Sequence, residues 1–148
     1  MSLEDLSEHE QQLVFEGRGE TIVSVDAERG FDNNGAPIAC LAIATGMYHA
    51  TFEIREEEID LFLGASEADW NRRDSRTIGR CLGSKVFWCS DATSISVLIG
   101  HDDESWSICF TLPPPTLKKI SDVLAPLRSW LLTTPYQSPT NDEANPNA

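Results

Sequence analysis

The sequence predicts a single α+β domain in which an antiparallel sheet carries its helices on one side. Two observations predict this class. Apolar residues recur at every second position over 48–54 and 106–112, as in strands with one buried face, and each stretch is preceded by a short apolar run, 38–44 or 94–100. Each of these regions is followed by a stretch in which apolar residues recur every three or four positions, as in a helix. Strands that are grouped in sequence and closed by helices favour an α+β arrangement.

The first fifteen residues are expected to form a short amphipathic helix. Leu3, Leu6, Leu13 and Val14 are its apolar positions, and Ser2 begins a capping-box pattern. The N-terminus lacks a basic start with a continuous apolar stretch, and no window approaches the ~20 apolar residues of a membrane span. We therefore expect a cytoplasmic protein that does not associate with membranes.

The first strand-rich unit covers about residues 20–66. TIVSVDAERGF (21–31) and IACLAIA (38–44) are predicted strands joined by the turn sequence DNNGAP, and a third strand ends at Ile54. A helix is expected from about Glu56 to Leu63. Three consecutive glutamates suit the positive end of its dipole, and Gly64 is placed to end it.

The second unit covers about residues 84–132. SKVFWCS (84–90), SISVLIG (94–100) and a stretch from Trp106 to Leu112 are its predicted strands. A helix follows the three prolines at 113–115. Pro126 falls inside its apolar stripe and should end or kink it, which leaves Trp130, Leu131 and Leu132 as a short continuation. The apolar stripe of this helix consists of Leu117, Ile120, Leu124 and Leu127.

The two units match when the chain is compared with itself at a shift of 58 residues. The coinciding pairs are Tyr48 with Trp106, Ala50 with Ile108, Phe52 with Phe110, Ile54 with Leu112, Ile59 with Leu117 and Phe62 with Ile120. This pattern predicts two strand-hairpin-helix units, a possible internal repeat, within one domain of residues 1–132. Residues 67–83 would link the units. Residues 133–148, rich in proline and small polar residues, are expected to be a disordered tail.

The chain is strongly acidic. Its 24 aspartates and glutamates against 11 lysines and arginines leave a net charge of −13 and a pI near 4.4. Such a surface repels phosphate backbones and anionic membranes, and it attracts basic proteins. We therefore expect a basic protein partner and regard nucleic acid as an unfavourable one. Solubility alone is an alternative explanation of the acidity.

The stretch GHDDESW (100–106) places His101, Asp102, Asp103 and Glu104 next to Trp106. Oxygen and imidazole groups this close are potential cation ligands, but the spacing of a calcium loop is missing and no second histidine lies nearby. Aspartates also suit turns. The matching tip of the first unit, TGMYH, contains no acid. We interpret 101–104 as a hairpin tip whose acids are available for a partner, and we expect no metal site.

The segment 67–80 contains four arginines and Trp70. Arginines can bind a phosphate or carboxylate group, and a tryptophan can stack on a base or an arginine. We favour the alternative, in which the arginines neutralise acidic neighbours and Trp70 anchors the segment to the core.

Cys40, Cys81, Cys89 and Cys109 lie in apolar surroundings without a C-x-x-C pair, which indicates buried thiols. No G-x-S-x-G nucleophile motif and no phosphate-binding loop occurs. We expect no enzymatic activity and no cofactor.

The doubled unit, with Phe52 and Ile54 in one half and Phe110 and Leu112 in the other, resembles the repeat of the PUR and Whirly single-strand-binding families. The resemblance covers about residues 20–132 and implies contacts through Trp88, Trp106 and the arginine linker. Those families use basic and aromatic strand faces, whereas matching lysines and arginines are missing here.

A second resemblance is to small acidic bacterial proteins of immunity or uncharacterised type. It rests on the order of a helix ending near Trp70, a linker, a hairpin with Trp106, a strand ending at Leu112 and Pro113, and a final helix with Leu117, Ile120 and Leu124. It implies a protein that neutralises a toxin by binding it.

The resulting hypothesis is a non-enzymatic acidic protein-binding module, of immunity or inhibitor type, that blocks a basic surface. Its predicted contact residues are Asp102, Asp103, Glu104, Trp106, Glu56, Glu57 and Glu58. The alternatives are a single-stranded nucleic-acid-binding domain and a metal-dependent enzyme that uses the cluster at 101–104.

Overall fold

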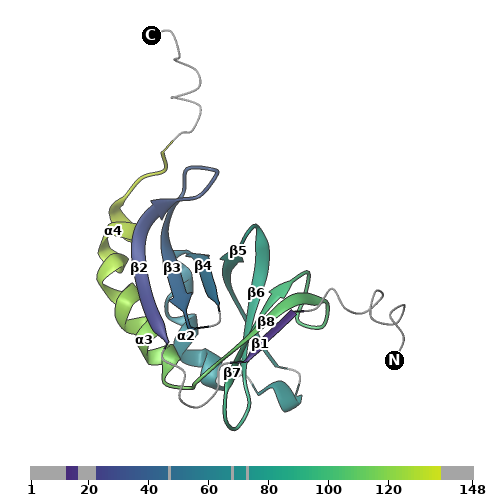
Figure 1. The fold of residues 1–148 in the computed structure, drawn as a ribbon. Coiled ribbons are helices and arrows are strands. Elements are labelled where there is room, and N and C mark those ends of the chain that lie inside the picture. The colour runs from purple at the N-terminus through teal and green to yellow at the C-terminus, as the bar shows by residue number, and fades with distance from the viewer. Residues whose placement is uncertain (1–12, 17–22, 47, 68, 73, 138–148) are drawn as a thin grey trace, which may run out of the picture.

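One curled sheet makes up most of the molecule (Figure 1). The computed structural model describes residues 13–16, 23–46, 48–67, 69–72 and 74–137. The strand order is β1-β8-β7-β6-β5-β4-β3-β2; neighbours from β2 to β8 are antiparallel, and β1 lies parallel to β8 at one edge. The strands are β1 (Leu13–Glu16), β2 (Ser24–Phe31), β3 (Pro37–Ala44), β4 (His49–Ile54), β5 (Arg76–Cys81), β6 (Ser84–Ser90), β7 (Ile95–Gly100) and β8 (Trp106–Leu112).

The helices lie on one face of this sheet. α3 (Thr116–Leu124) and α4 (Arg128–Thr133) run along β2 and β3 (Figure 1). The 3-10 turn η4 (Ala125–Leu127) separates them, because Pro126 interrupts the helix as predicted. Between β4 and β5 the chain forms only short pieces, which are η1 (Glu56–Glu58), α2 (Leu61–Gly64), η2 (Ala65–Glu67) and η3 (Trp70–Arg72).

The inner face of the sheet and the helices enclose a single core. Alternate residues of the strands point into it. Trp88 lies at its centre, and the ring centroids of Phe62 and Phe52 lie 4.9 and 5.7 Å from that of Trp88. The buried indole Nε1 of Trp88 donates to the carbonyl oxygen of Ile78 at 3.0 Å. Tyr48, next to β4, stacks on Phe110 of β8 at 4.2 Å. This contact across the core requires the sheet to curl.

The sheet divides into two halves at the junction of β4 and β5. These strands share one register pair, Glu53 with Arg80, and the pairing of β5 with β6 shifts between Thr77 and Arg80. Gly79, with φ of 77°, lies in this irregular stretch. An added Cβ there would lie 2.9 Å from the carbonyl oxygen of Glu53, so only glycine fits. Figure 1 shows β2–β4 and β5–β8 diverging from this point.

The second half also has a core on its outer face. Phe87, Cys89, Leu98 and Cys109 are buried there, and Trp106 packs against them. The strands β6 and β7 are therefore buried on both faces. This explains why their sequences, SKVFWCS and ISVLIG, are largely apolar rather than alternating.

Several expectations differ from the structure. Leu13–Glu16 form a strand rather than the end of an N-terminal helix, while residues 1–12 lie outside the described part. The predicted helix from Glu56 to Leu63 is replaced by η1 and the four-residue α2, so two matching strand-hairpin-helix units are not observed. The coarser prediction is confirmed in part: β2–β8 form an antiparallel sheet and the C-terminal helix packs on it, but the regular secondary structure of the described residues is mostly β-strand.

The predicted linker and tail are also more ordered than expected. Residues 76–81 of the linker form β5, which completes the sheet between the two units. Thr133 belongs to α4, and the backbone N–H of Gln137 donates to the carbonyl oxygen of Gly35 at 2.7 Å. The rest of the predicted tail, 138–148, lies outside the described residues.

Candidate binding surface

Two of the three acids at the β7–β8 tip form hydrogen bonds within the fold. Asp102 accepts hydrogen bonds from the backbone N–H groups of Glu104 at 2.8 Å and Ser105 at 2.6 Å, and these bonds lower the pKa of its carboxyl. Asp103 accepts a hydrogen bond from the Ser75 hydroxyl at 2.7 Å. At the β3–β4 tip, the hydroxyl of Thr45 accepts from the N–H of Tyr48 instead. Both tips therefore contain a side-chain acceptor for backbone N–H groups, which is Thr45 in the first half and Asp102 in the second.

The predicted contact run 56–58 is also largely engaged. Glu56 forms an ion pair with Arg128 at 3.4 Å. Glu58 accepts from the N–H groups of Arg55 at 2.9 Å and Gly79 at 2.7 Å, so it fixes the glycine at the junction of the two halves. Glu57 is exposed.

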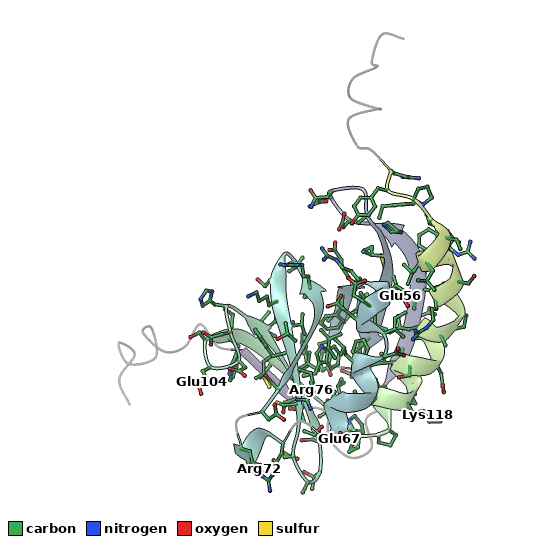
Figure 2. The ribbon with its side chains drawn as sticks, turned by 180° about the vertical axis from the view of Figure 1, so that it is seen from behind. Glu56, Glu67, Arg72, Arg76, Glu104 and Lys118 are labelled. Atoms are coloured by element: carbon green, nitrogen blue, oxygen red, sulfur yellow. The ribbon has the colours of Figure 1, made fainter. Side chains whose placement is uncertain are left out.

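The predicted contact residues do not form one surface. Glu56 and Glu104 lie on opposite sides of the molecule (Figure 2). Trp106 is half-buried against the outer core of the second half and takes part in its packing. Trp88, which the nucleic-acid alternative requires as a stacking platform, is fully buried and inaccessible to a base.

Three carboxylates gather instead on the outer face of β2–β4. Asp26 and Glu28 point outward from β2, and Glu53 points outward from β4. Between them lie the small side chains of β3. Glu28, Cys40 and Glu53 occupy one row across the three strands. Burial raises the pKa of the Cys40 thiol, and the neighbouring carboxylates of Glu53 and Glu28 raise it further. We call Asp26, Glu28 and Glu53 with Cys40, Ala42 and Ala44 the acidic face.

The carboxylates of the acidic face have no structural role within the part of the chain that the structure describes. Asp26, Glu28 and Glu53 have neither a hydrogen bond nor an ion pair there, and the same holds for the nearby Glu57. The sequence analysis missed this face. The signal was present, because Asp26 and Glu28 are two residues apart in a predicted strand and so had to share one side of it.

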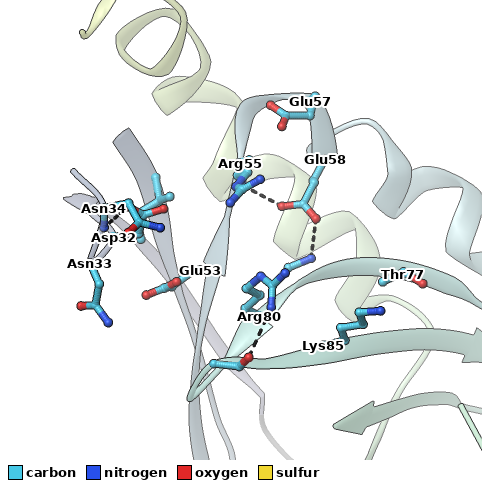
Figure 3. A pocket seen from close by; sticks show the side chains of 13 residues that line it. Asp32, Asn33, Asn34, Glu53, Arg55, Glu57, Glu58, Thr77, Arg80 and Lys85 are labelled. Carbon is cyan, nitrogen blue, oxygen red and sulfur yellow. Dashed lines mark hydrogen bonds between the residues drawn. The ribbon is translucent and has the colours of Figure 1, made fainter. Parts of the chain in front are cut away.

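A polar cleft of about 520 Å³ continues from the acidic face (Figure 3). It lies between the β2–β3 turn, η1 and the β5–β6 hairpin, and the buried Ile38 lines it. Its acidic lining residues are Asp32, Glu53, Glu57 and Glu58. Its basic lining residues are Arg55, Arg80 and Lys85. Sequence reasoning placed Arg80 in a linker and did not identify this cleft.

Two other arginines of the predicted linker pair with acids, as we favoured. Arg76 pairs with Asp74 at 3.0 Å, and Arg72 lies 3.9 Å from Asp69. Arg73 and the side chain of Trp70 lie outside the described residues.

Histidine, cysteine and acidic side chains are the groups that metal binding or thiol chemistry would use. Within the described ranges, no group of three or more histidine, cysteine, aspartate and glutamate side chains is arranged to hold a metal ion. Cys81, Cys89 and Cys109 are buried, and burial raises the pKa of Cys89 to about 12. Cys40 is half-buried on the acidic face.

No family model, curated protein or solved structure matches this chain. No helix in the described part is long and apolar enough to cross a membrane.

Proposed function

We propose that this protein is a non-enzymatic acidic binding module that covers a basic surface of another protein, as an immunity-type or inhibitor protein does. The observation that carries the proposal is the acidic face. Its carboxylates have no partner among the described residues although the fold uses many other acids in turns and ion pairs. Carboxylates that are exposed and grouped attract basic partners and speed their association.

The shape of the acidic face suits this role. The outward residues of β3 between the carboxylates are Cys40, Ala42 and Ala44, all of them small. Lysine or arginine side chains of a partner could therefore lie along β3 and reach Asp26 and Glu28 on one side and Glu53 on the other. Glu57 extends the same acidic surface to the rim of the cleft.

The compartment that we propose is the cytoplasm. All four cysteines are thiols, and three of them are buried in the two cores. Reducing compartments maintain thiols in this form.

The test compares two variants with the same loss of charge. Asp26→Asn/Glu28→Gln removes two carboxylates from the acidic face, and Glu67→Gln/Glu104→Gln removes two exposed carboxylates elsewhere. Tagged wild-type protein should capture a basic protein from the native host, and the purified pair should associate more slowly as salt increases. The control variant should retain binding, whereas the face variant should lose at least about tenfold in affinity, equivalent to ~1.4 kcal/mol.

Two results would contradict the proposal. One is the absence of any specific basic protein partner. The other is equal affinity of the face variant and the control variant, which would assign the effect to net charge rather than to this surface.

A further inference from the structure

The cleft beside the acidic face has the size of a small-molecule site. Its volume of about 520 Å³ lies within the range of about 300–1,000 Å³ typical of ligand pockets. Its walls come from four strands, the β2–β3 turn and η1, so several separate elements position its charged groups (Figure 3).

Charges of both signs line this cleft without neutralising one another. None of Arg55, Arg80 and Lys85 forms an ion pair within the described part of the chain, although four carboxylates line the same cleft. Glu53 and Arg80 are even register partners on neighbouring strands. Lysine and arginine in an acidic protein would be expected to pair with such neighbours.

Hydrogen bonds to the backbone hold some of these charges in place. Both carboxylate oxygens of Glu58 accept backbone N–H groups, from Arg55 and from Gly79. One oxygen of Asp32 accepts the N–H groups of Asn34 and Ala36 at 2.8 and 2.9 Å. The Nη1 of Arg80 donates to the carbonyl oxygen of Gly83 at 3.3 Å. Glu58 and Asp32 are therefore committed to the fold and are restrained from turning toward the cations.

The groups that remain available define the ligand. A carboxylate of the ligand can accept hydrogen bonds from Arg55, from Lys85 and from the guanidinium nitrogens of Arg80 that do not bond to Gly83. Arginine and lysine each present several donors. Glu53 and Glu57 can accept from a cationic group. An anion without a cationic group would face carboxylates, and a cation without an anionic group would face guanidinium groups. A ligand that carries both satisfies both sets.

We propose that this cleft binds a small zwitterion of the amino-acid class, with its carboxylate on Arg55, Lys85 and Arg80 and its cationic group on Glu53 and Glu57. This inference goes beyond the protein partner proposed above: the cleft shares Glu53 and Glu57 with that surface, but the ligand is a small molecule and its test requires no protein partner.

A titration with three probes tests the chemistry. L-arginine carries a carboxylate and cationic groups, agmatine lacks the carboxylate, and succinate lacks the cation. In NMR spectra of the ¹⁵N-labelled protein, L-arginine should shift the amide signals of Gly79, Arg80 and Gly83 saturably. Agmatine and succinate should bind at least about tenfold more weakly, because each leaves one set of charged groups unpaired. Absence of a saturable shift with L-arginine, or equal affinity for the three probes, would overturn the proposal.

Matched variants then test the location. Arg55→Gln/Lys85→Gln should weaken L-arginine binding at least about tenfold. Neither side chain has an ion pair or hydrogen bond in the described residues, so the fold should persist, and thermal melting checks this. Arg72→Gln/Lys118→Gln removes the same charge outside the cleft and should bind like the wild type.

A second variant keeps the proposal testable if the first is destabilised. Glu57→Gln removes one exposed carboxylate from the rim. It should weaken L-arginine binding and leave succinate binding unchanged or stronger. Wild-type affinity for L-arginine in both the basic and the acidic variants of the cleft would show that the ligand binds elsewhere.

Discussion

The two halves of the sheet share an inner core but differ on their outer faces. On β2–β4 most outward positions are small or acidic and at least partly exposed. On β6–β8 the central outward positions, Phe87, Cys89, Leu98 and Cys109, are buried in a second core. In both halves the inward-facing residues of the strands are apolar and form the shared core. The outward positions decide whether the other face is a surface or an interior. The outer face of the first half is therefore the one that is available to a binding partner.

The largest expected effect contrasts the two outer faces directly. Leu98→Ala removes a side chain from the outer core of the second half, where only 3% of it is exposed. Because a cavity would remain, the free energy of unfolding should fall by about 2–5 kcal/mol. Thr51→Ala changes an exposed outward position of β4 and should alter the free energy of unfolding by no more than about 0.5 kcal/mol. Urea unfolding measures both. A small cost for Leu98→Ala would mean that the second half has no true outer core.

The next effect concerns the junction of the two halves. Gly79→Ala places a Cβ at positive φ and 2.9 Å from the carbonyl oxygen of Glu53, which should cost at least about 1–3 kcal/mol. Gly83 also has positive φ, but no atom lies within 4 Å of its added Cβ. Gly83→Ala should therefore cost only the backbone term of about 1–2 kcal/mol. Equal losses in thermal or urea unfolding would show that the close contact with the Glu53 carbonyl adds nothing to the backbone cost at Gly79.

A smaller effect concerns two turns of the second half and should appear as a dependence of the melting temperature on pH. Backbone N–H groups lower the pKa of Asp102 in the β7–β8 turn and of Asp91 in the β6–β7 turn. A carboxyl with a lowered folded-state pKa stabilises the protein above its unfolded pKa, and this contribution is lost as pH falls through the folded pKa. The melting temperature should therefore drop below about pH 4. Asp102→Asn should lower stability at neutral pH and weaken the acid dependence. If the melting temperature of Asp102→Asn fell with pH as steeply as that of the wild type, the loss of stability in acid would be due to other carboxyls.

The smallest effect changes no stability and reports accessibility alone. Cys40 lies half-buried on the acidic face, whereas Cys89 and Cys109 point to the buried outer face of the second half. Alkylation of the native protein, followed by mass spectrometry, should label Cys40 first. Labelling should be slow, because burial and two glutamates raise the pKa of its thiol. Equal labelling of Cys89 would show that the outer core opens readily.

β4 and β8 were predictable because one buried face leaves a period of two in the sequence, and β3, β6 and β7 were predictable as short apolar runs. The predicted boundaries of β6 and β8 agree with the structure, and those of β3 and β7 differ by one residue. The helix after Pro115 was predictable from its stripe and from Pro126. β5 was missed because Ile78 is its main buried apolar residue and Gly79 interrupts the alternation.

The candidate sites were harder to predict than the fold. Asp102 and Glu58 looked like contact residues because they are acidic, yet their hydrogen bonds to backbone N–H groups become visible only in three dimensions. The matched tips at a shift of 58 residues suggested that acids were unnecessary there. In the structure both tips use a side chain to accept backbone N–H groups, which is Thr45 in one and Asp102 in the other. These two residues do not coincide at this shift, so the similarity was not visible in the sequence. The cleft joins residues 32 to 85, and no local motif indicates it.

The position of β2 at the end of the strand order has a further consequence for self-association. An edge strand offers unpaired backbone groups to any other strand, and a second copy of the same chain is the nearest candidate at high concentration. Two antiparallel β2 strands meeting edge to edge would bring Asp26 and Glu28 of one molecule against those of the other. The mutual repulsion of these carboxylates opposes aggregation through this edge, so the same charges that we propose to attract a basic partner also keep identical molecules apart.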